Sequence, residues 1–292
     1  MEFIRNQGKG TVEEREVRLR EGTLPLLYFP LLEETGLITH CFTTRQGGVS
    51  QGVCASLNLS FTRGDDPKAV EQNFQRVAEA LGVTTDRFVL SHQTHTTNVR
   101  KVGKEDAGCG ITREDCLKDV DGLITNEPGL VLSTFYADCV PLYFLDPVHK
   151  AIGLSHSGWR GTVGRMGRET LKAMEREYQT RPKDTLCVIG PSICQDCYEV
   201  SQDVIQAFSQ EFGPGAREFY VENARGRYQL DLWKANEAVL EEAGVKREHI
   251  ATAGLCTCCN HKLLFSHRAS GGKRGNLGAF FMLKQAEESN IF

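Results

Sequence analysis

The chain has 292 residues, 40% of them hydrophobic and 25% charged, with a formal net charge of −4 at pH 7. This composition is typical of globular domains and excludes disordered and fibrous classes, and the length allows a large core. No apolar run approaches the ~20 residues that span a bilayer, no secretory signal opens the chain, and no Lys/Arg-rich run offers a surface to nucleic acid. We therefore expect a cytoplasmic protein that binds a small molecule, without membrane or nucleic-acid partners.

Eleven cysteines are spread along the chain. Their odd number and the missing export signal argue against a framework of disulfide bonds, which belongs to oxidising compartments. We expect free thiols, with metal binding as one use for them.

The sequence predicts a mixture of strands and helices. Residues 38–45, ITHCFTTR, are rich in β-branched and aromatic residues and stop at a glycine-rich turn, which is typical of a strand. Residues 65–83 begin with two aspartates and a proline and carry apolar residues at helical spacing. Further strands are expected at 87–102, 121–125, 130–140, 141–146, 151–157 and 186–190, and further helices at 162–178, after residue 201 and at 231–245. Several strands are apolar throughout, as in sheets covered on both faces, so we expect a single α/β or α+β domain with mixed sheets.

Familiar catalytic fingerprints are missing from the sequence. It has no G-x-G-x-x-G motif after a strand, no Walker loop and no H-E-x-x-H pair. GLSHSG comes near to a serine nucleophile elbow, but Ser157 stands where that motif needs a glycine. Nucleotide-fold oxidoreductases, P-loop enzymes and zincin proteases are therefore disfavoured.

Nitrogen and sulfur donors stand at the ends of the expected strands. His92 and His95 lie in SHQTHTTNV, Cys139 lies in ADCVP, and His156 lies in LSHSGW. Two histidines and a cysteine suit a catalytic zinc that keeps one position open to water or substrate. Because strand side chains alternate, His92 and His95 cannot both face one site within a strand, so one is a ligand and the other supports it. A Cys/His nucleophile pair and ordinary core residues are the alternatives.

Two C-x-x-C pairs form a rival set. Cys194 and Cys197 make the first pair, and Cys256 and Cys259 make the second. Such pairs can build a structural zinc site with four cysteine ligands, although the 58 residues from 198 to 255 exceed the usual spacing. A redox pair and plain packing are the alternatives, and neighbouring Cys258 also has no role that follows from the sequence.

Arginines beside glycine-rich loops are a further signal. Arg45 precedes QGGVS, Arg160 follows Trp159, and Arg268 and Arg274 lie in SHRASGGKRGN. A guanidinium group binds phosphate or carboxylate at two points, and glycine lets backbone amides approach an anion. We therefore expect an anionic or phosphate-bearing substrate.

These motifs together resemble a known family. The order of the motifs is the one found in the YfiH/YlmD family: FTTRQGGVSQG with SLNL, SHQTH, VDGLIT, ADCVPL, SHSGWRGTV, GPSICQDCYEV, and CT with LFSHR. That family carries the older label of laccase-domain or multicopper polyphenol oxidase proteins, and includes purine nucleoside phosphorylases related to the animal enzyme FAMIN. The resemblance runs from about residue 37 to the C-terminus, and leaves residues 1–36 as an N-terminal strand and extension of one domain, 1–292.

The resemblance implies a fold, a metal and an activity. The fold is a four-layer α-β-β-α sandwich, similar to the catalytic domain of cytotoxic necrotizing factor. The metal is zinc, with copper as the alternative, held by His95, Cys139 and His156. The activity is phosphorolysis of adenosine, inosine and methylthioadenosine, with adenosine deamination beside it, in a monomer or weak homodimer. Two departures are visible, because Thr96 and Ser157 replace a glycine and an alanine of the family motifs.

The remaining residues receive roles on the same basis. Cys139, His156, Arg45 and Asp138 are the expected catalytic residues, and Asn58, His92, Arg160 and Arg268 are the expected substrate contacts. Arg45 is expected to position phosphate or ribose, and Asp138 or His92 to carry a proton. The alternatives are a Cys139-dependent hydrolase, a copper-dependent oxidase, and a non-enzymatic factor in envelope maintenance or division.

Overall fold

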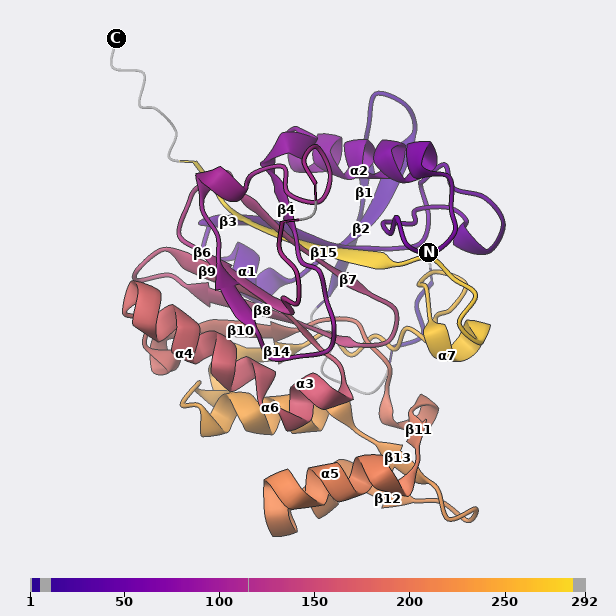
Figure 1. Ribbon diagram of the computed structural model, residues 1–292, viewed down its shortest axis with the longest axis vertical. Helices are drawn as coiled ribbons and strands as arrows, with labels where there is room; N and C mark the ends of the chain where they lie inside the picture. The colour runs from indigo at the N-terminus through magenta and orange to yellow at the C-terminus, as the bar shows by residue number, and fades with distance from the viewer. Residues whose placement is uncertain (1, 6–11, 115, 286–292) are drawn as a thin grey trace.

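Two six-stranded mixed sheets form the centre of the structure, a computed structural model that describes residues 2–5, 12–114 and 116–285 (Figure 1). The first sheet has the order β1 (Glu13–Arg18), β2 (Thr23–Tyr28), β3 (Ile38–Thr43), β15 (Leu277–Leu283), β7 (Val131–Tyr136) and β4 (Phe88–Leu90). The second has the order β14 (Ile250–Thr252), β10 (Leu186–Ile189), β8 (Val140–Asp146), β9 (Ala151–Ser157), β6 (Gly122–Thr125) and β5 (Val99–Lys101). A small third sheet contains β11 (Glu199–Val200), β13 (Tyr228–Leu230) and β12 (Tyr220–Glu222).

The helices lie mainly over the outer faces of these sheets. They are α1 (Pro30–Glu33), α2 (Pro67–Leu81), α3 (Trp159–Val163), α4 (Met166–Tyr178), α5 (Gln202–Phe212), α6 (Leu232–Glu242) and α7 (His267–Ser270). Helix α2 covers the first sheet, while α4 and α6 cover the second (Figure 1). The expected mixed-sheet α+β class is therefore confirmed.

The two sheets pack face to face through strands that are buried along their whole length. All residues of β8, β9 and β15 are buried, as their continuous apolar character predicts. Phe42, Tyr136, Tyr143 and Phe281 fill the space between the sheets. Strands β8 and β9 form a hairpin, because they pair antiparallel from Val140↔Ser157 to Asp146↔Ala151.

Helix α2 follows from local sequence signals. Asp66 caps its first turn by accepting a hydrogen bond from the backbone N–H of Lys68, Pro67 occupies that turn, and Gly82 ends the helix in the left-handed conformation. Its buried face packs on Phe88 and neighbouring residues of the first sheet. The predicted helix over 65–83 is thus confirmed.

Three predicted elements are interrupted. The strand expected at 87–102 is two strands, β4 and β5, which belong to different sheets. The run at 130–140 also divides, because β7 ends at Tyr136 in the first sheet and β8 begins at Val140 in the second. The helix expected at 162–178 breaks at Arg165, whose φ is 60°, a backbone angle that a helix cannot contain.

One cysteine pair departs from the expected free thiols. Cys109 and Cys116 form a disulfide bond within one loop, with their Cα atoms 5.9 Å apart. Nine other cysteines carry free thiols. Among the described residues, no helix has both the length and the apolar character needed to cross a membrane.

Candidate functional site

Three donor side chains meet where the chain passes from one sheet to the other. The side-chain donor atoms of His95, Cys139 and His156 all lie within 4.8 Å of one another. His95 lies between β4 and β5, Cys139 lies between β7 and β8, and His156 lies near the end of β9. Two of the three donors, His95 and Cys139, therefore lie in the breaks of the predicted strands.

A buried carboxylate, Asp121, orients both histidines. Its Oδ1 atom lies 2.8 Å from Nδ1 of His156 and accepts a hydrogen bond from the backbone N–H of His95 at 3.1 Å. Its Oδ2 atom accepts from the backbone N–H groups of Thr94 and Thr96. These contacts hold the His95 loop and leave Nε2 of His156 free to face the site. Sequence reasoning missed Asp121, although it stands in the VDGLIT motif.

Gly158 allows the donors to approach. A Cβ atom added at this residue would lie 3.0 Å from Sγ of Cys139 and 3.2 Å from Cδ2 of His95. Such distances are tighter than ordinary van der Waals contact. A larger residue in place of the glycine of the SHSGWRG motif would therefore have to displace Cys139 or His95 slightly.

The electrostatics of the site favour a charged pair. Burial by itself raises the pKa of the Cys139 thiol, but the charge of His156 and hydrogen bonds from both histidines outweigh it and lower the pKa to about 6. Burial lowers the pKa of His156, yet Cys139 and Asp121 outweigh that effect and raise it to about 9. Without a metal, the pair is thus a thiolate beside an imidazolium.

The donor set fits zinc. Two imidazole nitrogens and one thiolate are ligands that zinc accepts, and a three-ligand set leaves the fourth position open for catalysis. Asp121 supplies the carboxylate that commonly supports a zinc-bound histidine. A multicopper centre requires several histidine clusters, and the described part of the chain gathers only one group that contains histidine. The described residues therefore give no support to a copper-dependent oxidase.

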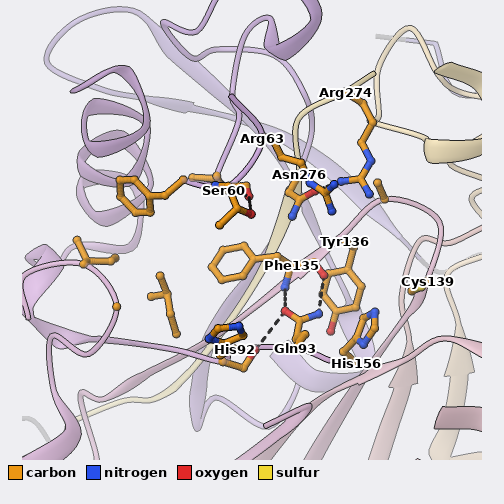
Figure 2. Close-up of a pocket in the computed structure, with 18 of the residues that line it drawn as sticks. Ser60, Arg63, His92, Gln93, Phe135, Tyr136, Cys139, His156, Arg274 and Asn276 are labelled. Carbon is orange, nitrogen blue, oxygen red and sulfur yellow. Dashed lines mark hydrogen bonds between the residues drawn. The ribbon is translucent and has the colours of Figure 1, made fainter. Parts of the chain in front are cut away.

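A cavity of about 550 Å³ opens beside the three donors. Leu90, Ile111 and Phe135 form an apolar part of its wall, and Tyr136 lies next to His156 (Figure 2). The side-chain amide of Gln93 is fixed by two hydrogen bonds with the backbone of Phe135, at 2.7 and 2.8 Å (Figure 2). This size and this mixture of apolar wall and fixed polar groups suit a small aromatic ligand.

Two arginines line another part of the cavity. Arg63 and Arg274 lie next to each other in Figure 2. Burial and the charge of Arg63 lower the pKa of Arg274 to about 10. Nε of Arg274 is buried without a hydrogen-bond partner among the residues that the structure describes. Two adjacent cations with an unused donor favour an anion at this place. The sequence had singled out Arg274 but not Arg63.

The arginine that was expected to hold the substrate lies elsewhere. Nε and Nη2 of Arg45 donate to the backbone carbonyl of Ala55, Nη1 donates to that of His261, and the guanidinium stacks on Phe265. Arg45 does not line the cavity. Asn58 also lies outside the cavity lining, because its buried amide binds Ser60, Asp65 and Asn276.

Asp138 and Arg268 also hold backbone rather than facing the cavity. Asp138 has a φ of 92°, and its carboxylate accepts from the hydroxyl of Thr257 at 2.6 Å and from the backbone N–H of Arg268 at 2.7 Å. The Arg268 guanidinium donates to the carbonyls of Cys197 and Glu199. These bonds fix the residue before Cys139, which makes Asp138 a positioning residue.

Besides Arg274, four of the residues expected as metal ligands, catalytic groups or substrate contacts line the cavity. His95 lines it, as do His92, Cys139 and His156, which are labelled in Figure 2. Arg160 is exposed at the start of α3 and stacks on Trp159, outside the cavity lining. Strand β4 ends at Leu90, before His92 and His95, so the alternation of strand side chains does not keep the two histidines from lining the same cavity.

Comparison with known proteins adds a family to this geometry. Residues 39–284 match the model of a family described as multi-copper polyphenol oxidoreductase laccase. Purine nucleoside phosphorylase YlmD of Bacillus subtilis (strain 168) is 38% identical over 246 residues, which cover 84% of this chain and 88% of that protein. This chain belongs to the YfiH/YlmD family.

Other members of the YfiH/YlmD family are similar in sequence and structure. The crystal structure of Bacillus licheniformis hypothetical protein YfiH has a TM-score of 0.85 with 34% identity, and covers 89% of this chain and 96% of that one. A protein named adenosine deaminase RL5, from an unknown prokaryotic organism, is 35% identical over 237 residues, which cover 80% of this chain and 90% of RL5. The family thus includes relatives named for two activities on nucleosides.

Proposed function

We propose that this protein is a zinc-dependent purine nucleoside phosphorylase, which converts adenosine, inosine or methylthioadenosine and phosphate to the free base and a ribose 1-phosphate. The observation that carries the proposal is the joint lining of one cavity by the His95, Cys139 and His156 donors, an apolar wall and the Arg63–Arg274 pair. The naming of relatives such as YlmD supports the same substrate class.

The base and the phosphate have distinct places in this proposal. Leu90, Ile111 and Phe135 offer apolar surface to the faces of the purine ring. Arg63 and Arg274 hold phosphate at the sugar carbon, where positive charge develops as the bond to the base breaks. Holding both reactants in one cavity replaces a collision in solution by a fixed geometry.

The metal ligands in this proposal are His95, Cys139 and His156. Zinc, when bound, supplies a Lewis acid that polarises an oxygen ligand at its open position. Asp121 keeps Nδ1 of His156 protonated, so that Nε2 carries the lone pair toward the metal. The lowered pKa of Cys139 in the metal-free pair depends on the charge of His156, so zinc must displace one proton from that ring when both residues bind it.

The test is a chromatographic assay of zinc-quantified protein with adenosine, in phosphate buffer and in phosphate-free buffer. Adenine and ribose 1-phosphate are expected only where phosphate is present, and His156→Ala should abolish them. His149→Ala is the matched control, since His149 also pairs with a buried aspartate but lies at the far end of β8. Intact adenosine in both buffers, with zinc bound, would overturn the proposal.

Adenosine deamination is a second candidate, favoured by the relative RL5 and by two carboxylates in the cavity lining, Glu71 and Glu114. Deamination needs a group that carries a proton to the departing ammonia, and a carboxylate can do so. Inosine formed equally in both buffers would establish this activity, and Glu71→Gln and Glu114→Gln would identify the carrier by loss of inosine alone.

A Cys139-dependent hydrolase is a third candidate, because Cys139 is hydrogen-bonded to His156 and His156 is hydrogen-bonded to Asp121. A thiolate on zinc is a weaker nucleophile than a free one, so the two mechanisms exclude each other. Metal-free protein should react fast with iodoacetamide at Cys139, and zinc should block that reaction. Hydrolysis that rises when zinc is removed would favour the hydrolase.

We also propose the finer features of the fold. The stacking of α2, the first sheet, the second sheet, and α4 with α6 supports a four-layer α-β-β-α sandwich of the cytotoxic necrotizing factor class, built as one domain over residues 1–292. A monomer or weak homodimer is the expected assembly, and sedimentation across a range of protein concentrations tests it.

A further inference from the structure

We propose that the protein carries a second zinc site, structural in role, formed by Cys194, Cys197, Cys256 and Cys259. This four-cysteine site uses none of the residues of the proposed reaction, so it stands independently of the phosphorylase assignment. The two C-x-x-C pairs that are far apart in sequence come together in the fold, and all four sulfur atoms lie within 4.8 Å of one another.

The sheet topology explains why the two pairs meet. Strands β10 and β14 are parallel neighbours, so the loops that follow them leave the same edge of the second sheet. One loop carries the first cysteine pair, and the other carries the second pair. Backbone hydrogen bonds tie the loops together, from Ser192 to the carbonyl of Leu255 and from Thr257 to the carbonyl of Ser192, both at 3.1 Å.

The sulfur geometry fits a tetrahedral metal. A zinc ion with Zn–S bonds of ~2.3 Å places its four sulfur ligands ~3.8 Å apart. Sγ of Cys259 lies 3.9 Å from Sγ of Cys194 and 3.5 Å from Sγ of Cys197. All four cysteines are free rather than disulfide-bonded. Because Cys259 is near two partners rather than one, a single redox pair does not account for the cluster.

Backbone amides also point at one of the sulfurs. The N–H groups of Cys194 and Cys259 lie 3.2 and 3.4 Å from Sγ of Cys256. N–H donors directed at sulfur stabilise a thiolate, the form that binds a metal, and are of no comparable use to a packed thiol. Cys194 and Cys256 are buried while Cys197 and Cys259 are partly exposed, so an ion can enter from the surface.

The four-cysteine site has a clear structural role. It joins the two loops that grip Asp138, because Ile193 donates its N–H to the Asp138 carbonyl at 2.9 Å and Thr257 binds the Asp138 carboxylate. Asp138 immediately precedes Cys139. A metal at the four-cysteine site would therefore fix the backbone that presents Cys139 from the second sheet.

Metal analysis of matched variants tests the proposal without measuring activity. Wild-type protein should bind about two zinc ions per chain, and His95→Ala should keep about one. The double variant Cys197→Ser/Cys259→Ser should also keep about one, while Cys258→Ser, a cysteine of the same loop outside the set, should keep both. A metal-free His95→Ala protein that remains folded would overturn the four-cysteine site.

Cobalt substitution covers the case in which the double serine variant fails to fold. Cobalt bound to His95→Ala protein should show the intense near-ultraviolet absorption of several thiolate ligands, which the four-cysteine site supplies and a single thiolate does not. Thiol counting in the absence of metal should recover all four cysteines as free. Recovery of a Cys197–Cys259 disulfide from freshly prepared protein, with weak cobalt absorption, would replace the zinc site by a redox pair.

Discussion

Nδ1 of His156 lies 2.8 Å from Oδ1 of Asp121, and the same oxygen accepts the backbone N–H of His95. One buried carboxylate thereby sets the ring orientation of one donor and the loop position of another. Burial raises the pKa of Asp121, but the hydrogen bond from His156 and those from Thr96 and Thr94 outweigh it and lower the pKa to about 2. The carboxylate is therefore charged throughout the range in which enzymes work.

The variant Asp121→Asn should weaken zinc binding by roughly 10- to 100-fold, the usual effect of removing a carboxylate behind a ligating histidine. Competition with a chromophoric chelator measures this affinity. Asp146→Asn is the control, since Asp146 is also buried and lies 2.8 Å from Nδ1 of His149 but stands away from the donors. Equal zinc affinity in the two variants would show that Asp121 does not support zinc binding.

The variant Gly158→Ala should lower zinc affinity by about tenfold, because the new methyl group displaces Cys139 or His95 by a few tenths of an ångström. The free energy of unfolding of the metal-free protein should change little. Gly215→Ala serves as the control, since a Cβ there would meet nothing within 4 Å. A Gly158→Ala protein with native zinc affinity would show that the three donors adjust more freely than proposed.

The variant Arg274→Gln should raise the KM for phosphate by roughly 10- to 100-fold, since a hydrogen bond to a charged group contributes ~1.5–3 kcal/mol. The KM for the nucleoside should stay near its original value. Arg63→Gln should act in the same direction, and the double variant should fall short of the summed effects because the two arginines share one ligand. Arg176→Gln, an exposed arginine of α4, is the control. A rise in the KM for the nucleoside alone would show that the two arginines bind the nucleoside rather than phosphate.

Acid should destabilise the protein through His40. This residue is buried on β3, and its Nε2 accepts the backbone N–H of Phe29 at 2.8 Å, which requires the neutral ring. Burial, with a smaller effect from Arg15, lowers its pKa from 6.5 to about 3. Between these two pKa values the unfolded chain binds a proton at His40 and the folded chain does not. The contribution of neutral His40 to the free energy of unfolding is therefore complete above pH 6.5 and declines as the pH falls toward 3.

The expected loss from His40 is about 2 kcal/mol between about pH 7 and pH 5. Urea unfolding of wild type and His40→Leu at both pH values measures it. The variant lacks the acceptor for Phe29 and should be less stable at neutral pH, but its stability should fall less on acidification. Parallel pH profiles would contradict the assignment of acid sensitivity to His40.

Local patterns predicted helix α2 and the buried strands, because caps, spacing and apolar runs are encoded within a few residues of each other. They did not predict that residues 87–102 would divide between two sheets, since each half is compatible with a strand. The division depends on which neighbours β4 and β5 find, β7 and β6, more than 20 residues away in the chain. Long-range pairing overrode a local pattern.

The site residues also divide into those with local sequence signals and those that depend on distant neighbours. His95, Cys139 and His156 stand in recognisable motifs, and their meeting agrees with the resemblance on which they were predicted. Arg45 was expected at the site but does not line the cavity, and Arg63 lines it but was not predicted, because a guanidinium gives no local sign of its partner. The Arg45 guanidinium donates to the carbonyls of Ala55 and His261. Arg63 forms a cationic pair with Arg274, which lies 211 positions further on in the sequence.

The donors at the two crossings between the sheets connect metal occupancy to folding. His95 and Cys139 belong to the segments by which the chain leaves the first sheet for the second, so their common ion would tie both crossings to β9. By thermodynamic linkage, the contribution of this ion to the free energy of unfolding should then rise by ~1.4 kcal/mol for each tenfold increase in free zinc above the dissociation constant of the site. Loss of the ion would then loosen both crossings at once and lower the stability of the whole two-sheet core, whatever its effect on catalysis.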